Sequence, residues 1–231
     1  GFAAGNNIGI SWLVSNRSTE FMWILNNDTE VHSSCLASIT EQIPNYPDVE
    51  IWGSTIVSSD TGLIQYGGGG FYNPITSMAK PYKEGLGLET LSDVSCFRGL
   101  DYISGAAMLV KAELFQRTSG FEESFFLYYE ELDLAKKLTP MKMAWCPSSV
   151  VYHQGSATIG GSHSEIAQYH ENLSTFKFTA LNYPLYLPFV MTIRIFGKPL
   201  ILLASKRARL IPTVYRASFD FFNWLIFDRK Q

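Results

Sequence analysis

Short apolar runs alternate with polar stretches through the first two thirds of the chain. Phe21–Leu25 is a continuous apolar run that stops abruptly at Asn26, which is typical of a buried strand followed by a polar loop. Further strands are predicted at 49–57, 106–110, 143–145 and 150–152. Helices are predicted at 7–14, 33–43, 112–118 and 130–138. Strands that alternate with helices are typical of an α/β domain.

Residues 58–100 interrupt this alternation. They are rich in Gly, Ser and Pro and include the run Gly67–Gly70. The run lacks the Lys-Ser/Thr of a P-loop and the spaced glycines of a dinucleotide fingerprint. Loops and short strands are therefore expected here, without a phosphate site.

From Ser164 onward the pattern becomes helical, with breaks predicted at the prolines 184, 188, 199 and 212. We predict a catalytic domain at 1–180 and a helical, amphipathic tail at 181–231. Residues 194–231 carry eight Lys/Arg and two acidic residues, a net charge of +6, whereas the preceding part carries a net −9. Because the tail has no uncharged run of 18 residues, a spanning helix is not expected. A basic, apolar tail favours contact with an anionic membrane surface, and packing on the catalytic domain is the alternative.

Composition indicates the size of the core, and the cysteines indicate the cellular compartment. The chain has 231 residues, of which 46% are hydrophobic and 17% charged, so it can bury a sizeable core. Its three cysteines are widely spaced and odd in number, which favours a reducing compartment. We therefore expect a cytoplasmic protein, with association to the cytoplasmic face of a membrane left open. No nucleic-acid partner is expected.

Two predicted strand ends carry candidate metal ligands. Asn26 and Asp28 follow the first apolar run, in the position where open α/β sheets bind ligands. A hard divalent cation prefers such oxygen ligands. His153 follows another short strand. The alternatives are a turn in which Asn and Asp cap the next helix, and a hydrogen-bonded structural histidine.

Glu131 is a candidate general base. In a helix over 130–138 it falls within the apolar stripe, while Glu130, Asp133 and Lys137 point the other way and Asp133 can pair with Lys137. A carboxyl on the inward stripe loses water, which raises its pKa toward the value that a general base needs. The alternative is a surface helix in which Glu131 only flanks the core.

The first residues are a weaker candidate. Gly5, Asn6 and Asn7 stand at the predicted start of a helix, where free backbone N–H groups attract phosphate or carboxylate.

Several of these segments occur in a fixed order. They are 1–9, 25–29, 102–109, 120–134 and His153 with the following Gly155-Ser156. In order and spacing they resemble the family 2 inverting glycosyltransferases of GT-A fold, particularly the rhamnosyltransferase-like branch of bacterial cell-surface polysaccharide synthesis. The resemblance covers roughly residues 1–180 and implies a mixed sheet flanked by helices.

The resemblance also implies roles. Asn26, Asp28 and His153 match the metal and diphosphate positions, with Mg²⁺ or Mn²⁺ as the cofactor. Glu131 matches the base of the Glu-Asp motif, with Glu130 and Asp133 as further candidates, because this chain has Glu-Glu at the motif. Candidates for donor binding are Asn6, Asn7, Asn26 and Gly105. Relatives usually begin with a strand-helix-strand unit that binds the nucleotide, so the chain is expected to be N-terminally truncated and to expose a sheet edge there.

The implied reaction is a single displacement at the anomeric carbon of a nucleotide-diphosphate sugar by the hydroxyl of a glycan or lipid-linked acceptor. Two alternatives remain from the sequence. One is a non-catalytic or truncated domain for sugar binding or assembly, and the other is a metal-dependent phosphohydrolase or nucleotidyltransferase, which would need more clustered carboxylates.

Overall fold

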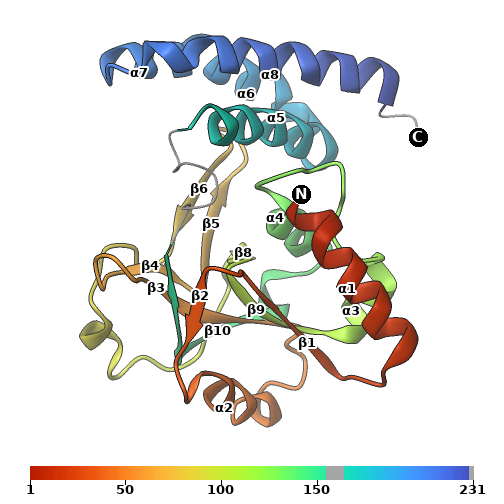
Figure 1. Ribbon diagram of the computed structural model, residues 1–231, viewed down its shortest axis with the longest axis vertical. Coiled ribbons are helices and arrows are strands. Elements are labelled where there is room, and N and C mark those ends of the chain that lie inside the picture. Colours follow the sequence, from red (N-terminus) through yellow and green to blue (C-terminus); the bar gives the residue numbers. More distant parts are fainter. Residues whose placement is uncertain (155–163, 229–231) are drawn as a thin grey trace.

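A mixed sheet carries the body of the protein, and a layer of helices lies along one end of it (Figure 1). The computed structural model describes residues 1–154 and 164–228. The larger sheet has seven strands, with the order β1-β9-β3-β10-β2 and with β4 and β7 paired to β3 and β10. Its strands are β1 (Phe21–Leu25), β2 (Thr29–Val31), β3 (Ile51–Ser58), β4 (Ile64–Gly67), β7 (Phe97–Arg98), β9 (Ala107–Lys111) and β10 (Met143–His153). A smaller sheet contains β5 (Gly69–Asn73), β6 (Met78–Pro81) and β8 (Tyr102–Ile103).

Helices cover both faces of the larger sheet, as the predicted GT-A-like α/β class requires. Along β9, Met108 and Val110 enter the main core, while Leu109 joins a second cluster with Ile39 and Trp52 on the opposite face. This two-sided burial explains why the strands are continuous apolar runs. The helices of the body are α1 (Phe2–Asn16), α2 (Cys35–Thr40), α3 (Ala112–Thr118), α4 (Glu130–Lys136) and α5 (Glu165–Asn182). Strand β1 lies at one edge of the sheet.

One strand replaces two that the sequence predicts. Met143–His153 is a single strand, β10, parallel to β3, with an irregularity between Cys146 and Val150. Pro147 falls in this irregularity, where no ladder hydrogen bond is required from it. The separation at 147 was therefore wrong, because a bulge lets the proline stay within the strand.

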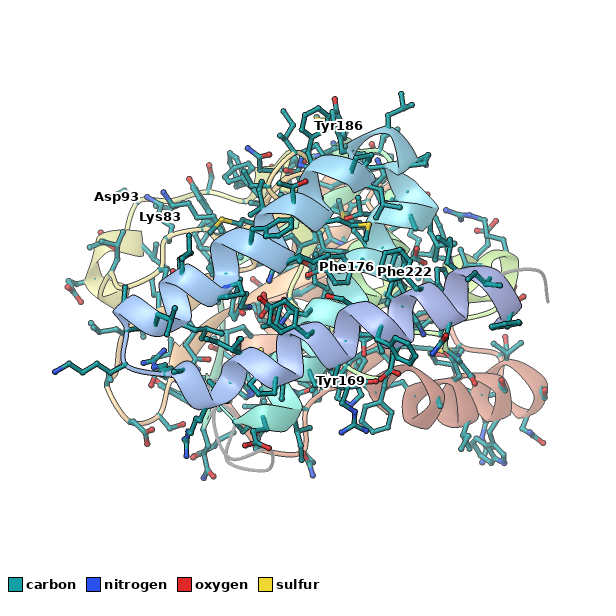
Figure 2. All side chains as sticks on the ribbon, turned by 90° about the horizontal axis from the view of Figure 1, so that it is seen from above. Lys83, Asp93, Tyr169, Phe176, Tyr186 and Phe222 are labelled. Carbon is teal, nitrogen blue, oxygen red and sulfur yellow. The ribbon has the colours of Figure 1, made fainter. Side chains whose placement is uncertain are left out.

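The remaining helices form what we call the helical layer, residues 184–228. It contains α6 (Leu187–Thr192), a π-helical turn (Ile193–Gly197), α7 (Lys198–Ala204), α8 (Ile211–Asn223) and a second π-helical turn (Trp224–Asp228). Seen from above, the α6–α7 helix and α8 lie side by side over the body (Figure 2).

The prolines in this layer do not all break helices. Pro184–Ala204 runs on as one helix, in which Pro188 and Pro199 are the second residues of α6 and α7. The π-helical turn directly before Pro199 absorbs the change in hydrogen-bond register that the missing N–H requires. The break predicted at 199 was wrong for this reason, and the break predicted at 188 was wrong because Pro188 stands in the first turn of α6, where its missing N–H is not needed.

Among the residues that the structure describes, Pro184–Ala204 is the one helix that is long and apolar enough to cross a membrane by length and composition, and 22% of its most apolar window is buried. The sequence expectation of no spanning helix rested on an uninterrupted uncharged run. Arg194 and Lys198 interrupt that run but leave the helix apolar enough to qualify.

Candidate active site

Asp28 and His153 lie side by side at the end of the sheet. Strand β1 ends at Leu25, and the chain turns into β2, whose Thr29 pairs with His153 at the end of β10. This pairing brings Asp28 Oδ1 within 3.2 Å of His153 Nε2, and both side chains are largely buried. The sequence prediction that the two meet at the carboxyl edge is confirmed.

The second nitrogen of His153 is held by β4. Its Nδ1 lies 2.9 Å from Gln65 Oε1, an acceptor, so this nitrogen carries the proton. The Nε2 lone pair then faces the Asp28 carboxylate, and Asn26 Nδ2 lies 3.4 Å from the same nitrogen. His153 Nε2 and Asp28 Oδ1 are then both acceptors, and at a separation of 3.2 Å they need a proton or a cation between them.

A divalent ion shared with a substrate fits this arrangement. Within residues 1–154 and 164–228 no group of three or more His, Cys, Asp or Glu side chains is placed to hold a metal alone. Mg²⁺ and related ions are commonly held by one or two protein ligands together with phosphate oxygens and water. Asp28 and His153 supply such a partial set.

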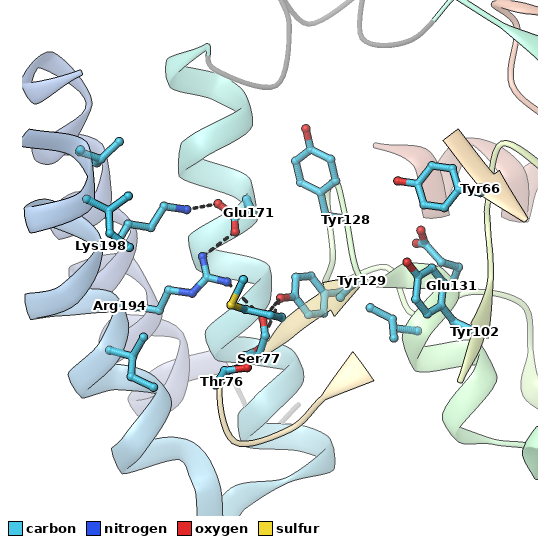
Figure 3. A pocket seen from close by; sticks show the side chains of 16 residues that line it. Tyr66, Thr76, Ser77, Tyr102, Tyr128, Tyr129, Glu131, Glu171, Arg194 and Lys198 are labelled. Atoms are coloured by element: carbon cyan, nitrogen blue, oxygen red, sulfur yellow. Dashed lines mark hydrogen bonds and ion pairs between the residues drawn. The ribbon is translucent and has the colours of Figure 1, made fainter. Parts of the chain in front are cut away.

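Glu131 opens into a cavity of about 390 Å³ between the body and the helical layer (Figure 3). Tyr66, Tyr102 and Tyr128 also line the cavity. Burial raises the pKa of Glu131 above the ordinary value for glutamate. Its carboxyl retains partial exposure because it faces this cavity. Burial, with the Glu131 charge, also raises the pKa of Tyr66 to about 12, so Tyr66 is a neutral hydroxyl beside the carboxyl.

A strained turn positions this carboxyl. Tyr128 and Tyr129 both adopt left-handed backbone conformations, with φ of 67° and 75°, immediately before α4. Such conformations are costly for bulky residues and persist only where the surroundings hold them. Here the Tyr129 hydroxyl donates to the carbonyl of Ser77 at 2.9 Å and accepts from Thr175 at 2.9 Å. The turn thereby fixes where α4 begins and directs Glu131 into the cavity.

Glu130 is not on the outer face of α4. It is 2% exposed, and burial together with the neighbouring Glu131 raises its pKa to about 8. Within the described part of the chain its Oε1 has no hydrogen-bond partner. The predicted outward orientation was wrong because neighbouring elements cover α4 on more than one side, including α5.

Asp133 is buried as well, which corrects its predicted orientation. Its predicted pairing with Lys137 is confirmed at 3.3 Å. The amide of Asn182, in α5, donates to the same carboxyl at 3.1 Å. Asp133 does not line the cavity, so among the acidic candidates of α4 it is Glu131 that the cavity exposes.

The helical layer supplies the opposite wall of the cavity. Glu171, in α5, accepts hydrogen bonds from Arg194, at 2.5 Å, and from Lys198. Arg194 also donates to the Ser77 carbonyl at 3.2 Å, as the dashed lines of Figure 3 show. Burial opposes the charge of Glu171, but the two cations outweigh it and hold its pKa below the ordinary value. We call Glu171, Arg194 and Lys198 the charge bracket.

The donor-binding candidates near the N-terminus have other roles. Helix α1 begins at Phe2 rather than Asn7, and the Gly5 N–H already donates to Gly1, so the first-turn N–H groups expected at Gly5-Asn6-Asn7 are used within the helix. Asn6 caps its own turn by donating to the Phe2 carbonyl. Asn7 is buried and clamps α1 to the loop after α3, through the backbone of Phe121 and the carboxylate of Glu123.

Gly105 packs against Phe2, the first residue of α1. A side chain at Gly105 would meet the ring of Phe2 at 3.3 Å, so this glycine allows α1 to approach the end of β8. Of the donor candidates, Asn26 lies beside the Asp28–His153 pair, and its backbone N–H donates to the carbonyl of Ala106, the residue after Gly105, at 3.1 Å.

Strand β4 connects the two halves of the site. Gln65 bonds His153, whereas the next residue, Tyr66, lines the cavity of Glu131, because successive side chains of a strand point to opposite sides. The sequence analysis missed both residues, since they lie in the irregular stretch 58–100. It also missed the charge bracket, because nothing local in a helical pattern shows which of its charges points inward. Gly155 and Ser156, quoted with His153, lie outside the described residues.

Parts of the chain are similar to two curated glycosyltransferases. No protein-family model matches the chain. It is 33% identical over 88 residues to an N-acetylglucosaminyl-diphospho-decaprenol L-rhamnosyltransferase of Mycobacterium tuberculosis, which covers 36% of this chain and 27% of that protein. The low-salt glycan biosynthesis hexosyltransferase Agl10 of Haloferax volcanii is 23% identical over 142 residues, covering 58% of this chain and 41% of that protein. The matched regions thus span less than half the length of these curated relatives.

The fold has a counterpart among solved structures. The structure of GalNAc-T7 with UDP, GalNAc and Mn²⁺ superimposes with a TM-score of 0.59 at 14% identity, covering the whole of this chain and 43% of that one. The chain therefore has the α/β fold of GT-A glycosyltransferases.

Proposed function

We propose that the protein transfers a sugar from a nucleotide-diphosphate donor to an acceptor hydroxyl, with inversion at the anomeric carbon and with Glu131 as the general base. The observation that carries the proposal is a carboxyl of raised pKa that opens into a cavity of a glycosyltransferase fold. The curated relatives, a rhamnosyltransferase and a hexosyltransferase, support transfer of a hexosyl or deoxyhexosyl group.

Glu131 has the properties that the base requires. It takes the proton of the acceptor hydroxyl as the oxygen attacks, and a raised pKa lets it hold that proton. The hydroxyls of Tyr66, Tyr102 and Tyr128 around it can donate to and accept from sugar hydroxyls and so orient the acceptor.

Asp28, His153 and Asn26 form the donor end in this proposal. Asp28 and His153 would hold the cofactor, Mn²⁺ or Mg²⁺, which when bound neutralises the charge of the departing diphosphate. Gln65 keeps the proton of His153 on Nδ1 and so keeps Nε2 available as a ligand. The GalNAc-T7 structure, which holds UDP and Mn²⁺, supports this class of donor and ion.

The acceptor class proposed is a glycan or lipid-linked sugar of cell-surface polysaccharide synthesis, handled on the cytoplasmic side. The M. tuberculosis relative, named for a diphospho-decaprenol substrate, supports the lipid-linked form.

Nucleotide sugars test the proposal directly. The 231-residue chain is incubated with a panel of nucleotide-diphosphate sugars and Mn²⁺, and thermal shift and donor hydrolysis are measured. We expect one nucleotide sugar to raise the melting temperature, with dependence on Mn²⁺ that Asp28→Asn abolishes. An absence of any shift across the panel, or a shift that Asp28→Asn leaves intact, contradicts the proposal.

A further inference from the structure

The α6–α7 helix has its charges on the inner side and its apolar side chains on the outer side. Arg194 and Lys198, its only charged residues, point inward to Glu171, and Arg194 is 7% exposed. The outward positions carry a stripe of exposed apolar side chains: Leu185, Phe189, Ile193, Phe196, Leu200 and Leu203. A surface helix in water has the reverse arrangement.

Helix α8 is apolar on two sides. One stripe, which contains Val214, Ala217 and Phe221, is fully buried against α5. On the exposed side, Phe219, Phe222 and Ile226 follow at helical spacing, and Phe219 is 66% exposed. Because the inner stripe already packs the helix onto the body, folding does not account for the outer one.

Basic residues accompany this apolar face. Lys206 and Arg209 are exposed in the turn that joins α7 to α8. Apolar side chains together with Lys and Arg are the composition of helices that lie in the interface of an anionic membrane. A second copy of the chain would instead bring another basic layer against the first.

The helix also stays with the body. The charge bracket ties the middle of Pro184–Ala204 to α5, and Tyr169 of α5 donates to Asp220 of α8 at 2.6 Å. If Pro184–Ala204 crossed the bilayer, Arg194 and Lys198 would lose their ion pairs with Glu171. We propose that the helical layer lies flat on the surface of an anionic membrane, with its exposed phenyl and aliphatic side chains in the interface.

This placement has a consequence for the cavity. Met78, Ile193 and Ile201 line the cavity and are also exposed, so its rim continues into the apolar face. On the proposed function, on which this step rests, the acceptor reaches Glu131 from the membrane and carries an apolar chain beside its sugar.

Vesicle flotation tests the docking surface. The full chain is floated with phosphatidylcholine vesicles, with and without phosphatidylglycerol, and we expect binding that requires the anionic lipid. The triple variant Phe189→Gln, Phe196→Gln, Phe219→Gln should bind far more weakly, by about tenfold for each ring removed. Lys206→Gln and Arg209→Gln should each weaken binding about fivefold. All these side chains are exposed, so folding is preserved and is checked by the melting temperature.

The matched control changes equally exposed apolar residues elsewhere. Ile8 and Trp12 of α1 are 75% and 53% exposed, and Ile8→Gln, Trp12→Gln should float like the parent. The proposal is overturned if the parent does not float with anionic vesicles, or if the control loses as much binding as the triple variant. It is also overturned if the parent is a dimer that the triple variant dissociates while neither binds lipid.

Two further measurements separate this proposal from the proposed function. Glu131→Gln should float like the parent, because it changes the cavity alone. With a synthetic alkyl glycoside in the vesicles as acceptor, the triple variant should lose transfer but keep donor hydrolysis. Flotation without donor turnover would refute the proposed transferase function and support the membrane docking. Donor turnover without flotation would support the function and refute the docking.

Discussion

The body and the α6–α7 helix place their largest apolar side chains differently. In the body, Trp52 and Trp145 are fully buried. In the α6–α7 helix, the charged side chains are inside and Phe196, for example, is 67% exposed. On the proposed docking, the exposed side chains of the layer meet a second apolar surface, whereas the tryptophans of the body pack within its own core.

The largest expected effect concerns the cavity that the two regions share. Glu131→Gln should lower transfer by roughly 100- to 10,000-fold, because the base acts in the transition state, while donor binding and melting temperature stay nearly unchanged. Steady-state kinetics and calorimetry measure both. Near-normal turnover in this variant, together with an inactive Glu130→Gln or Asp133→Asn, would move the base to the buried side of α4.

The charge bracket is the next test, since it joins the regions through buried charge. Arg194→Met leaves Glu171 with one cation and should destabilise the protein by about 3 kcal/mol, as removal of one partner of a buried ion pair does. Urea unfolding measures the loss. The control is Lys206→Met, which removes the same charge from an exposed position and should change stability by less than about 0.5 kcal/mol. Equal effects of the two would show that the inward charges do not hold the layer.

The buried carboxyl of Glu130 should make the stability of the folded protein depend on pH. The folded-state pKa of Glu130, about 8, lies above its unfolded value, so its favourable contribution is complete at low pH and is lost as pH rises from about 5 to 8. Glu130→Gln imitates the neutral acid, and its melting temperature should therefore gain on that of the parent over this range. The exposed Glu41→Gln should follow the parent throughout. A constant difference between parent and Glu130→Gln would contradict the buried, neutral carboxyl.

The smallest effect concerns how α8 is attached. Tyr169→Phe removes the hydrogen bond to Asp220 and should cost about 1 kcal/mol, measured by urea unfolding. Phe221→Ala, which opens a cavity in the buried stripe, should cost about 3 kcal/mol or more. If the tyrosine mattered more than the phenylalanine, polar ties rather than packing would hold the layer to the body.

How far the sequence predicts this molecule depends on whether a signal is local. Strand β1 and helix α3 have the predicted bounds, because an apolar run and a short amphipathic stretch are complete in themselves. Asp28 and His153 could be placed together because both follow strands that end at the same edge. Breaks predicted at Pro147 and Pro199 are absent, because a bulge and a π-helical turn accommodate these prolines. Residue type alone does not predict either backbone change.

Long-range packing explains the rest. The orientation of Glu130 depends on the elements that cover α4, and the inward direction of Arg194 depends on Glu171, 23 residues away. Tyr66, in β4 of the larger sheet, and Tyr102, in β8 of the smaller sheet, become neighbours of Glu131 only when both sheets and α4 meet at the cavity. Periodicity can predict that a helix forms, but it cannot show which of two polar faces another element will cover.

The charge bracket makes the cavity a thermodynamic link between the regions. One wall belongs to the body and the other to the α6–α7 helix, so the cavity exists only while the two are docked. Any ligand that fills it must bind the docked state more tightly than the separated one, and must therefore stabilise the docked position of the helix by the same free energy. Reciprocally, whatever holds the helix in place raises the affinity of the cavity for its ligand.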